Sequence, residues 1–161
     1  MKTINMTYVS SRTTARLECE RLLKQNGDIA LVALTSGTAQ RDIWLALSRS
    51  DVAVIDEEIM YFDGGETLAL LLACNPGVKF LAVMNNPNED KMLWAITHGV
   101  RGVILRRELL QLLARAIRQV HRGEVWMPRN LLNSFRDALN GDASGLVNPD
   151  AFAVNPRLRL H

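Results

Sequence analysis

Polar residues stand where short apolar stretches of the sequence end. Asp56 closes the apolar run at residues 52–55 and is followed by Glu57 and Glu58. Arg106 closes another apolar run at residues 102–105. A carboxylate can bind a hard cation or a guanidinium, and the guanidinium fork matches either a carboxylate or a phosphate. This pattern predicts an ionic site if the fold brings the ends of the two stretches together.

The spacing of apolar residues predicts that β-strands and helices alternate along most of the chain. The predicted strands are residues 4–9, 29–34, 52–55, 78–84 and 102–105, and the predicted helices lie within residues 12–26, 36–47, 66–74, 88–98 and 108–122. Such alternation is typical of a parallel sheet with helices on both faces. Right-handed crossovers favour a doubly wound, flavodoxin-like (CheY-like) α/β fold with strand order 2-1-3-4-5 and an extra C-terminal helix.

Open α/β sheets bind ligands beyond the carboxyl ends of their strands. In the predicted fold that edge carries Ser10, Ser11, Asp56, Met84 and Arg106. Serine hydroxyls are neutral ligands, and a methionine thioether cannot donate a hydrogen bond. We therefore expect Asp56 to be an exposed strand-end carboxylate that pairs with Arg106.

Composition indicates one soluble globular domain with an appendage. The chain has 161 residues, of which 48% are hydrophobic and 22% charged, with a formal net charge of +2. That charge does not indicate a nucleic-acid or membrane partner, and no apolar run is as long as a membrane span. A cytoplasmic location is expected. Cys19 and Cys74 are predicted to be buried free thiols, and no cluster has the spacing of a metal site.

Three segments resemble the receiver domains of two-component response regulators. They are Asp51-Val-Ala-Val-Ile-Asp56 with Asp63-Gly64, then Gly99-Val-Arg-Gly102-Val-Ile-Leu-Arg106, and Arg122-Gly-Glu-Val-Trp126-Met-Pro128. The last segment is similar to the receiver end of the NarL/FixJ (LuxR-type) subfamily of transcription regulators. The resemblance covers about residues 4–139 without insertions.

This resemblance implies specific roles for the strand-end residues. Asp56 matches the aspartate that takes a phosphoryl group from a histidine kinase. The acidic pair that helps to hold Mg²⁺ falls on Ser10 and Ser11. The family's Thr/Ser falls on Met84, its Lys on Arg106, its switch aromatic on Val103 and a loop Pro on Met60. With these departures, Mg²⁺ binding and phosphorylation at Asp56 are expected to be weak or absent, and the domain is expected not to be an enzyme.

The rest of the chain is expected to connect this domain to another. Residues 1–123 form the receiver-like domain, 124–140 a linker helix, and 141–161 a tail that begins a missing helix-turn-helix domain. DNA would be bound only through that missing domain; a natural stand-alone domain is the alternative. Leu110 and Leu112 widen the apolar face of the helix at 108–122, which predicts either a second buried surface or cover from the linker helix. Members of the family often form homodimers through the first and fifth helices.

Other functions remain open on the sequence. Trp126-Met127-Pro128-Arg129 is similar to the W-[F/L/M]-[T/S]-R motif of atypical members that bind cyclic di-GMP, so Trp126 and Arg129 are possible ligand residues of a small-molecule sensor. Proline in the third position removes a hydroxyl group and a backbone donor. A conventional phosphorelay receiver is a second alternative. A flavodoxin-like enzyme or electron carrier is a third alternative, and residues 10–14 only weakly resemble the phosphate-binding loop that it would need.

Overall fold

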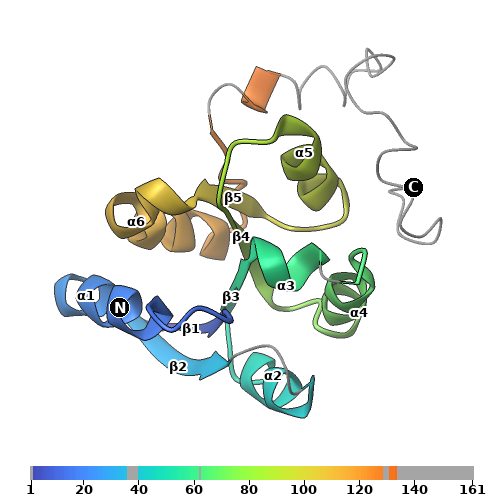
Figure 1. Ribbon diagram of the computed structural model, residues 1–161. Helices are drawn as coiled ribbons and strands as arrows, with labels where there is room; N and C mark the ends of the chain where they lie inside the picture. Colours follow the sequence, from blue (N-terminus) through green and yellow to red (C-terminus); the bar gives the residue numbers. More distant parts are fainter. Residues whose placement is uncertain (1, 36–39, 62, 129–130, 134–161) are drawn as a thin grey trace.

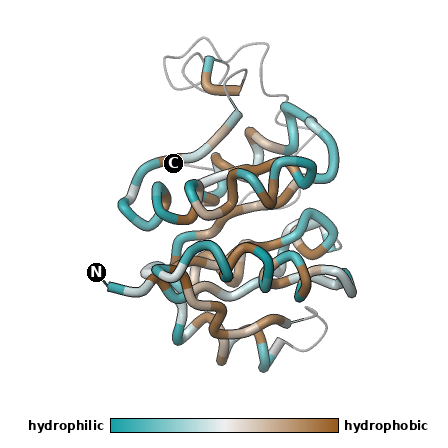
Figure 2. Tube along the Cα trace, turned by 90° about the vertical axis from the view of Figure 1, so that its left-hand side faces the viewer, coloured by the Kyte–Doolittle hydropathy of each residue, from teal (hydrophilic) through white to brown (hydrophobic). Residues whose placement is uncertain are grey.

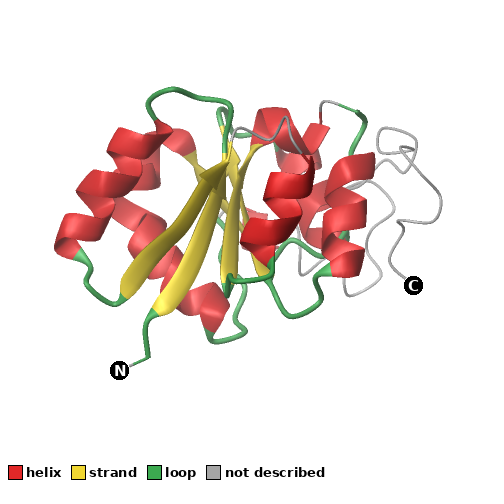
Figure 3. Ribbon diagram, turned by 90° about the horizontal axis from the view of Figure 1, so that it is seen from below, coloured by secondary structure: helices red, strands yellow, loops and turns green. Residues whose placement is uncertain are grey.

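The protein forms a parallel sheet of five strands with helices on both faces (Figures 1 and 3). The structure is a computed structural model, and it describes residues 2–35, 40–61, 63–128 and 131–133. The strand order is β2-β1-β3-β4-β5. The predicted doubly wound fold and its strand order are therefore confirmed.

Each predicted strand has a counterpart close to its predicted bounds. The strands are β1 (Ile4–Val9), β2 (Ile29–Thr35), β3 (Val52–Asp56), β4 (Lys79–Met84) and β5 (Gly102–Leu105). The helices are α1 (Ala15–Gln25), α2 (Gln40–Leu47), α3 (Glu57–Tyr61), α4 (Glu66–Cys74), α5 (Glu89–Thr97), the 3₁₀ turn η1 (Arg106–Glu108) and α6 (Leu109–His121). None of the described helices is long and apolar enough to cross a membrane.

Two hydrophobic cores lie on opposite faces of the sheet. Side chains alternate along β3, so Val52 and Val54 pack toward α1 and α6, whereas Ala53 and Ile55 pack toward α2, α4 and α5. All four of these side chains have no exposed surface. This two-sided burial explains why β3 is apolar at every position before Asp56.

Three local features differ from, or were absent from, the sequence-based predictions. Residues 57–61 form α3, which is not among the predicted helices, because a helix of five residues is too short to show a helical period in the sequence. β2 is only half-buried, since it lies at the edge of the sheet. The exposed Cys74 at the end of α4 was expected to be buried; as expected, neither it nor the buried Cys19 is in a disulfide.

The segment after α6 runs back along β5 instead of forming a simple turn. Trp126 forms an isolated parallel bridge with Gly102, and its backbone N–H donates to the Arg101 carbonyl at 3.0 Å. A Cβ atom on Gly102 would lie 2.5 Å from Leu81 Cδ1 and 3.2 Å from the Trp126 carbonyl oxygen. The absence of a side chain at residue 102 lets the segment approach. The linker helix was expected over 124–140. Residues 124–128 are not helical, residues 131–133 are helical, and residues 129–130 and 134–140 lie outside the described residues.

Gly65 offers a test of the packing under α4. Its φ is +92°, and an added Cβ would lie 2.5 Å from Trp94 Cη2. Gly65→Ala should lower the free energy of unfolding by about 2–4 kcal/mol, because left-handed backbone strain adds to a clash in the core. Urea unfolding followed by circular dichroism measures this loss. Gly27→Ala is the control: nothing lies within 4 Å of its added Cβ. Equal losses for both variants would show that the close packing of Gly65 on Trp94 is wrong.

Candidate functional site

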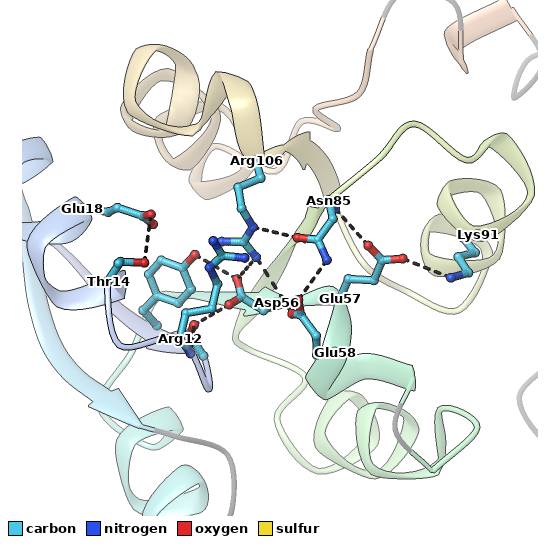
Figure 4. Close-up of polar contacts among 11 residues, drawn as sticks. Arg12, Thr14, Glu18, Asp56, Glu57, Glu58, Asn85, Lys91 and Arg106 are labelled. Carbon is cyan, nitrogen blue, oxygen red and sulfur yellow. Dashed lines mark hydrogen bonds and ion pairs between the residues drawn. The ribbon is translucent and has the colours of Figure 1, made fainter.

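Asp56 lies at the carboxyl end of β3 and is fully buried, with 0% of its surface exposed. The Tyr8 hydroxyl donates a hydrogen bond to Oδ1 at 2.9 Å, and the Ser10 hydroxyl donates to Oδ2 (Figure 4). Arg106 Nη2 lies 3.0 Å from Oδ1. The expected pairing with Arg106 is confirmed, whereas the expected exposure of Asp56 was wrong.

Strand geometry places three of these groups together. Tyr8 and Ser10 are two residues apart along β1 and its end, so their side chains leave the sheet on the same side. β1 pairs with β3 in parallel, with Tyr8 opposite Val54. Asp56 shares the side of Val54, and both side chains therefore face the α1–α6 side of the sheet. Ser10 is not part of α1, whose N-cap residue is Thr14.

Arg106 connects Asp56 to a second set of polar residues. Its Nε donates to Asn85 Oδ1 at 2.8 Å, and Asn85 Nδ2 donates to Glu58 Oε1 at 2.9 Å. The Asn85 backbone N–H donates to Glu57 Oε2 at 2.9 Å, and Glu57 forms an ion pair with Lys91 at 3.1 Å. This network joins the ends of β3, β4 and β5 to α3 and α5.

Burial and charge determine the protonation states in this network. Burial and the neighbouring Asp56 carboxylate both raise the pKa of Tyr8, which therefore donates as a neutral phenol. Burial lowers the pKa of Arg106, but the attraction of Asp56 outweighs this effect and the net change is upward. Burial likewise opposes ionisation of Glu58, yet the hydrogen bond from Asn85 makes the net change in its pKa downward. The site thus holds ionised Glu58 and a permanently charged Arg106.

The remaining predicted site positions do not join this cluster. Ser11 is exposed and makes none of the contacts described above. Met84 and Val103 have no exposed surface and belong to the core on the α2–α5 side, as does Met60. Tyr8 and Asn85 were missed by the sequence reasoning. Asn85 directly follows β4, so its place at the functional edge was a usable signal; Tyr8 lies inside a strand and gave none.

The donor set around Asp56 does not fit a magnesium ion. Mg²⁺ needs several oxygen ligands in near-octahedral geometry. Here two hydroxyl groups donate hydrogen bonds into the carboxylate, and a guanidinium supplies the positive charge. Within the described ranges, no group of three or more His, Cys, Asp or Glu residues could hold a metal ion.

A separate hollow of about 790 Å³ lies between α5, β5, α6 and the segment after α6. Val103 and Leu105 line it from β5, and Trp126 lines it from the returning segment. Trp126 is partly buried against the core, and the Arg115 guanidinium lies 6.0 Å from the centre of its ring. Of the two possible ligand residues, Trp126 borders this hollow, and Arg129 lies outside the described residues.

Comparison with known proteins identifies solved structures that share this fold. No protein-family model and no curated protein sequence matches this chain. Among solved structures, the response regulator RcsB of Salmonella typhimurium superposes with a TM-score of 0.71 at 16% identity, over 88% of this chain and 69% of that one.

Isolated receiver domains of RcsB are also similar. The apo domain from Salmonella enterica serovar Typhimurium gives a TM-score of 0.71 at 15% identity, over 83% of this chain and 99% of that one. The non-phosphorylated domain from Escherichia coli gives 0.66 at 17% identity, over 80% and 100%. This chain has the receiver-domain fold. At such identities the similarity shows the fold, and the functional residues have to be judged on their own geometry.

The ion pair at the site predicts a large effect on stability. Arg106→Met should lower the free energy of unfolding by about 3–5 kcal/mol, because it leaves the buried Asp56 carboxylate without a cation. Arg122→Met is the matched control: its pair with Glu124 is exposed on both sides, and such pairs contribute about 0–1 kcal/mol. Urea unfolding of both variants is the measurement. A loss at Arg106 as small as that at Arg122 would contradict the buried pair.

Proposed function

We propose that this chain is an atypical receiver-type regulatory domain, in which phosphorylation at Asp56 is weak or absent. The observation that carries the proposal is the fully buried Asp56 carboxylate, contacted by Tyr8, Ser10 and Arg106. A phosphoryl acceptor must present a free carboxylate oxygen in line with the phosphodonor. Here Oδ1 accepts from Tyr8 and Oδ2 accepts from Ser10, so a donor would first have to break these hydrogen bonds.

The residues around Asp56 also lack the charge stabilisation that phosphoryl transfer needs. Transfer depends on positioning and on cations that neutralise the transferred group. Ser10 and Ser11 replace carboxylates that would hold Mg²⁺, and Met84 cannot donate to a phosphoryl oxygen. Arg106 remains as a cation, but it already pairs with Asp56. These features support a domain that is not switched by a histidine kinase.

Regulation then proceeds through dimerisation and contact with partners. RcsB, whose fold this chain shares, has been solved as dimers bound to DNA. For this chain we propose that DNA is contacted by a helix-turn-helix domain for which residues 141–161 form the beginning. The described domain contributes association, and the regulated step is transcription.

A small phosphodonor tests the proposal. Incubation with acetyl phosphate and Mg²⁺, followed by intact-mass measurement, should show no gain of a phosphoryl group for the wild type or for Asp56→Asn. The RcsB receiver domain serves as the positive control. A stoichiometric gain in the wild type that Asp56→Asn abolishes would establish a conventional phosphorelay receiver instead.

The hollow beside Trp126 supports a second candidate function, the sensing of a cyclic dinucleotide. Its volume of about 790 Å³ lies within the range of small-molecule sites, about 300–1,000 Å³. Trp126 offers a ring on its wall, and Arg107 offers a guanidinium at the same hollow. Aromatic stacking and arginine contacts are the interactions that nucleobases and phosphates use.

Calorimetric titration with cyclic di-GMP tests this second function. Under the candidate, binding heat is expected for the wild type and should be lost in Trp126→Ala. Trp44→Ala, on α2 and away from the hollow, should bind like the wild type. Thermal melting verifies that each variant is folded. No heat from the wild type at high micromolar concentration would eliminate this function.

A further inference from the structure

The two helical layers of the domain carry opposite charge. α1 and α6 cover one face of the sheet, and α2 to α5 cover the other (Figures 1 and 3). The cations of the first layer, including the C-cap of α6, are Arg16, Arg21, Lys24, Arg115, Arg118 and Arg122. Its carboxylates, including the N-cap of α6, are Glu18 and Glu20 on α1 and Glu108. This basic layer therefore carries a net positive charge.

The layer formed by α2 to α5 has the reverse balance. Its carboxylates are Asp42, Glu57, Glu58, Glu66, Glu89 and Asp90. Its cations are Arg41 and Lys91, and Lys91 is already paired with Glu57. This acidic layer therefore carries a net negative charge, although the whole chain has a formal net charge of only +2.

Several of these charges form no ion pair with another described residue. Arg118 is neutralised by Asp28, and Arg122 by Glu124. By contrast, Arg21 and Lys24 on the basic layer are exposed and form no ion pair with any described residue. Asp42 and Glu66 on the acidic layer are also exposed, and within the same ranges they too form no ion pair. Exposed charges of the opposite sign are also present, Glu20 on the basic layer and Arg41 on the acidic layer, so one sign predominates on each layer.

Large apolar side chains accompany the free charges on both layers. Leu17 and Leu110 are 60% and 49% exposed on the basic layer, and Leu45 and Leu70 are 61% and 50% exposed on the acidic layer. Figure 2 views the basic layer from outside and shows hydrophilic and hydrophobic stretches alternating along its helices. Leu110 helps to line a shallow hollow of about 270 Å³ together with Arg21 and Lys24.

We propose that a second copy of this chain docks its acidic layer onto this basic layer, so that copies associate head to tail. The proposal rests on the proposed function, in which the domain acts by association. Charge complementarity favours this arrangement, because Arg21 and Lys24 would face Asp42 and Glu66 of the next copy. A two-fold contact through the basic layer would instead bring like charges together, which is unfavourable.

A head-to-tail contact has two consequences. The interface is heterologous, so the dimer of the proposed function leaves one free basic layer and one free acidic layer and can grow by adding further copies. Ion pairs at its edge are screened by salt, so association should weaken as the ionic strength rises.

Charge-reversal variants of the full chain test the proposal by sedimentation velocity at low salt. Arg21→Glu with Lys24→Glu reverses the basic layer, and Asp42→Lys with Glu66→Lys reverses the acidic layer. Each double variant alone should associate about tenfold more weakly than the wild type, because attraction becomes repulsion at two sites. An equimolar mixture should recover association, because the first variant carries acidic side chains on both layers and the second carries basic side chains on both. Every head-to-tail contact between the two variants then pairs opposite charges.

The outcomes separate this proposal from its alternatives. Lys2→Glu with Lys79→Glu, both outside the two layers, makes the same four-unit change in net charge as the basic-layer variant and should associate like the wild type. Thermal melts verify folding, and either double variant suffices if the other does not fold. Unchanged association, or a loss only when the basic layer is reversed, overturns the head-to-tail contact. The phosphodonor experiment is independent of these results, so the proposed function can fail while this contact stands.

Discussion

The edge of the sheet that carries the candidate site depends on one buried carboxylate. Asp56 has no exposed surface, and an ionised carboxylate without partners is very costly in a protein interior. Arg106 supplies the opposite charge, and the Tyr8 and Ser10 hydroxyls supply hydrogen bonds. The groups that offset the cost of burying Asp56 therefore come from β1 and its end and from the turn after β5. Three strands that are distant in sequence are thereby held in one arrangement at their carboxyl ends.

The same arginine links this charge to the helices. Through Asn85, Arg106 is connected to Glu57 and Glu58 at the start of α3, and Glu57 is connected to Lys91 on α5. A sheet of this fold with serines at residues 10 and 11 can in this way keep the carboxyl ends of its strands in one arrangement. We interpret the site as a structural ion pair with supporting hydrogen bonds, which holds the domain in one state. In our proposal, association depends instead on the charged faces of the two helical layers.

The sequence predicted those features that follow from a local, periodic pattern of residues. It did not predict features that depend on contacts between residues distant in sequence. The strand bounds followed from apolar runs. The helix predicted within residues 88–98 is α5, and the side chain of its N-cap residue Asn88 accepts from the Lys91 backbone N–H. The helix α3 was not predicted, because five residues are too few to show a helical period. Tyr8 was not predicted as a site residue, because an aromatic residue inside a strand ordinarily belongs to the core. Only the tertiary structure shows that its hydroxyl donates a hydrogen bond to Asp56 on β3.

The sequence by itself determined the alternating β/α order, the parallel sheet and the edge at which polar residues gather, because period and crossover handedness are properties of the chain. It also determined that Arg106 was the natural partner for Asp56. Only the tertiary structure decided that Asp56 is buried and that both its oxygens accept hydrogen bonds. Whether a side chain at a strand end is buried depends on the residues that pack over it. For Asp56 these residues come from β1 and from the turn after β5, and their distant positions in the sequence do not reveal the contact.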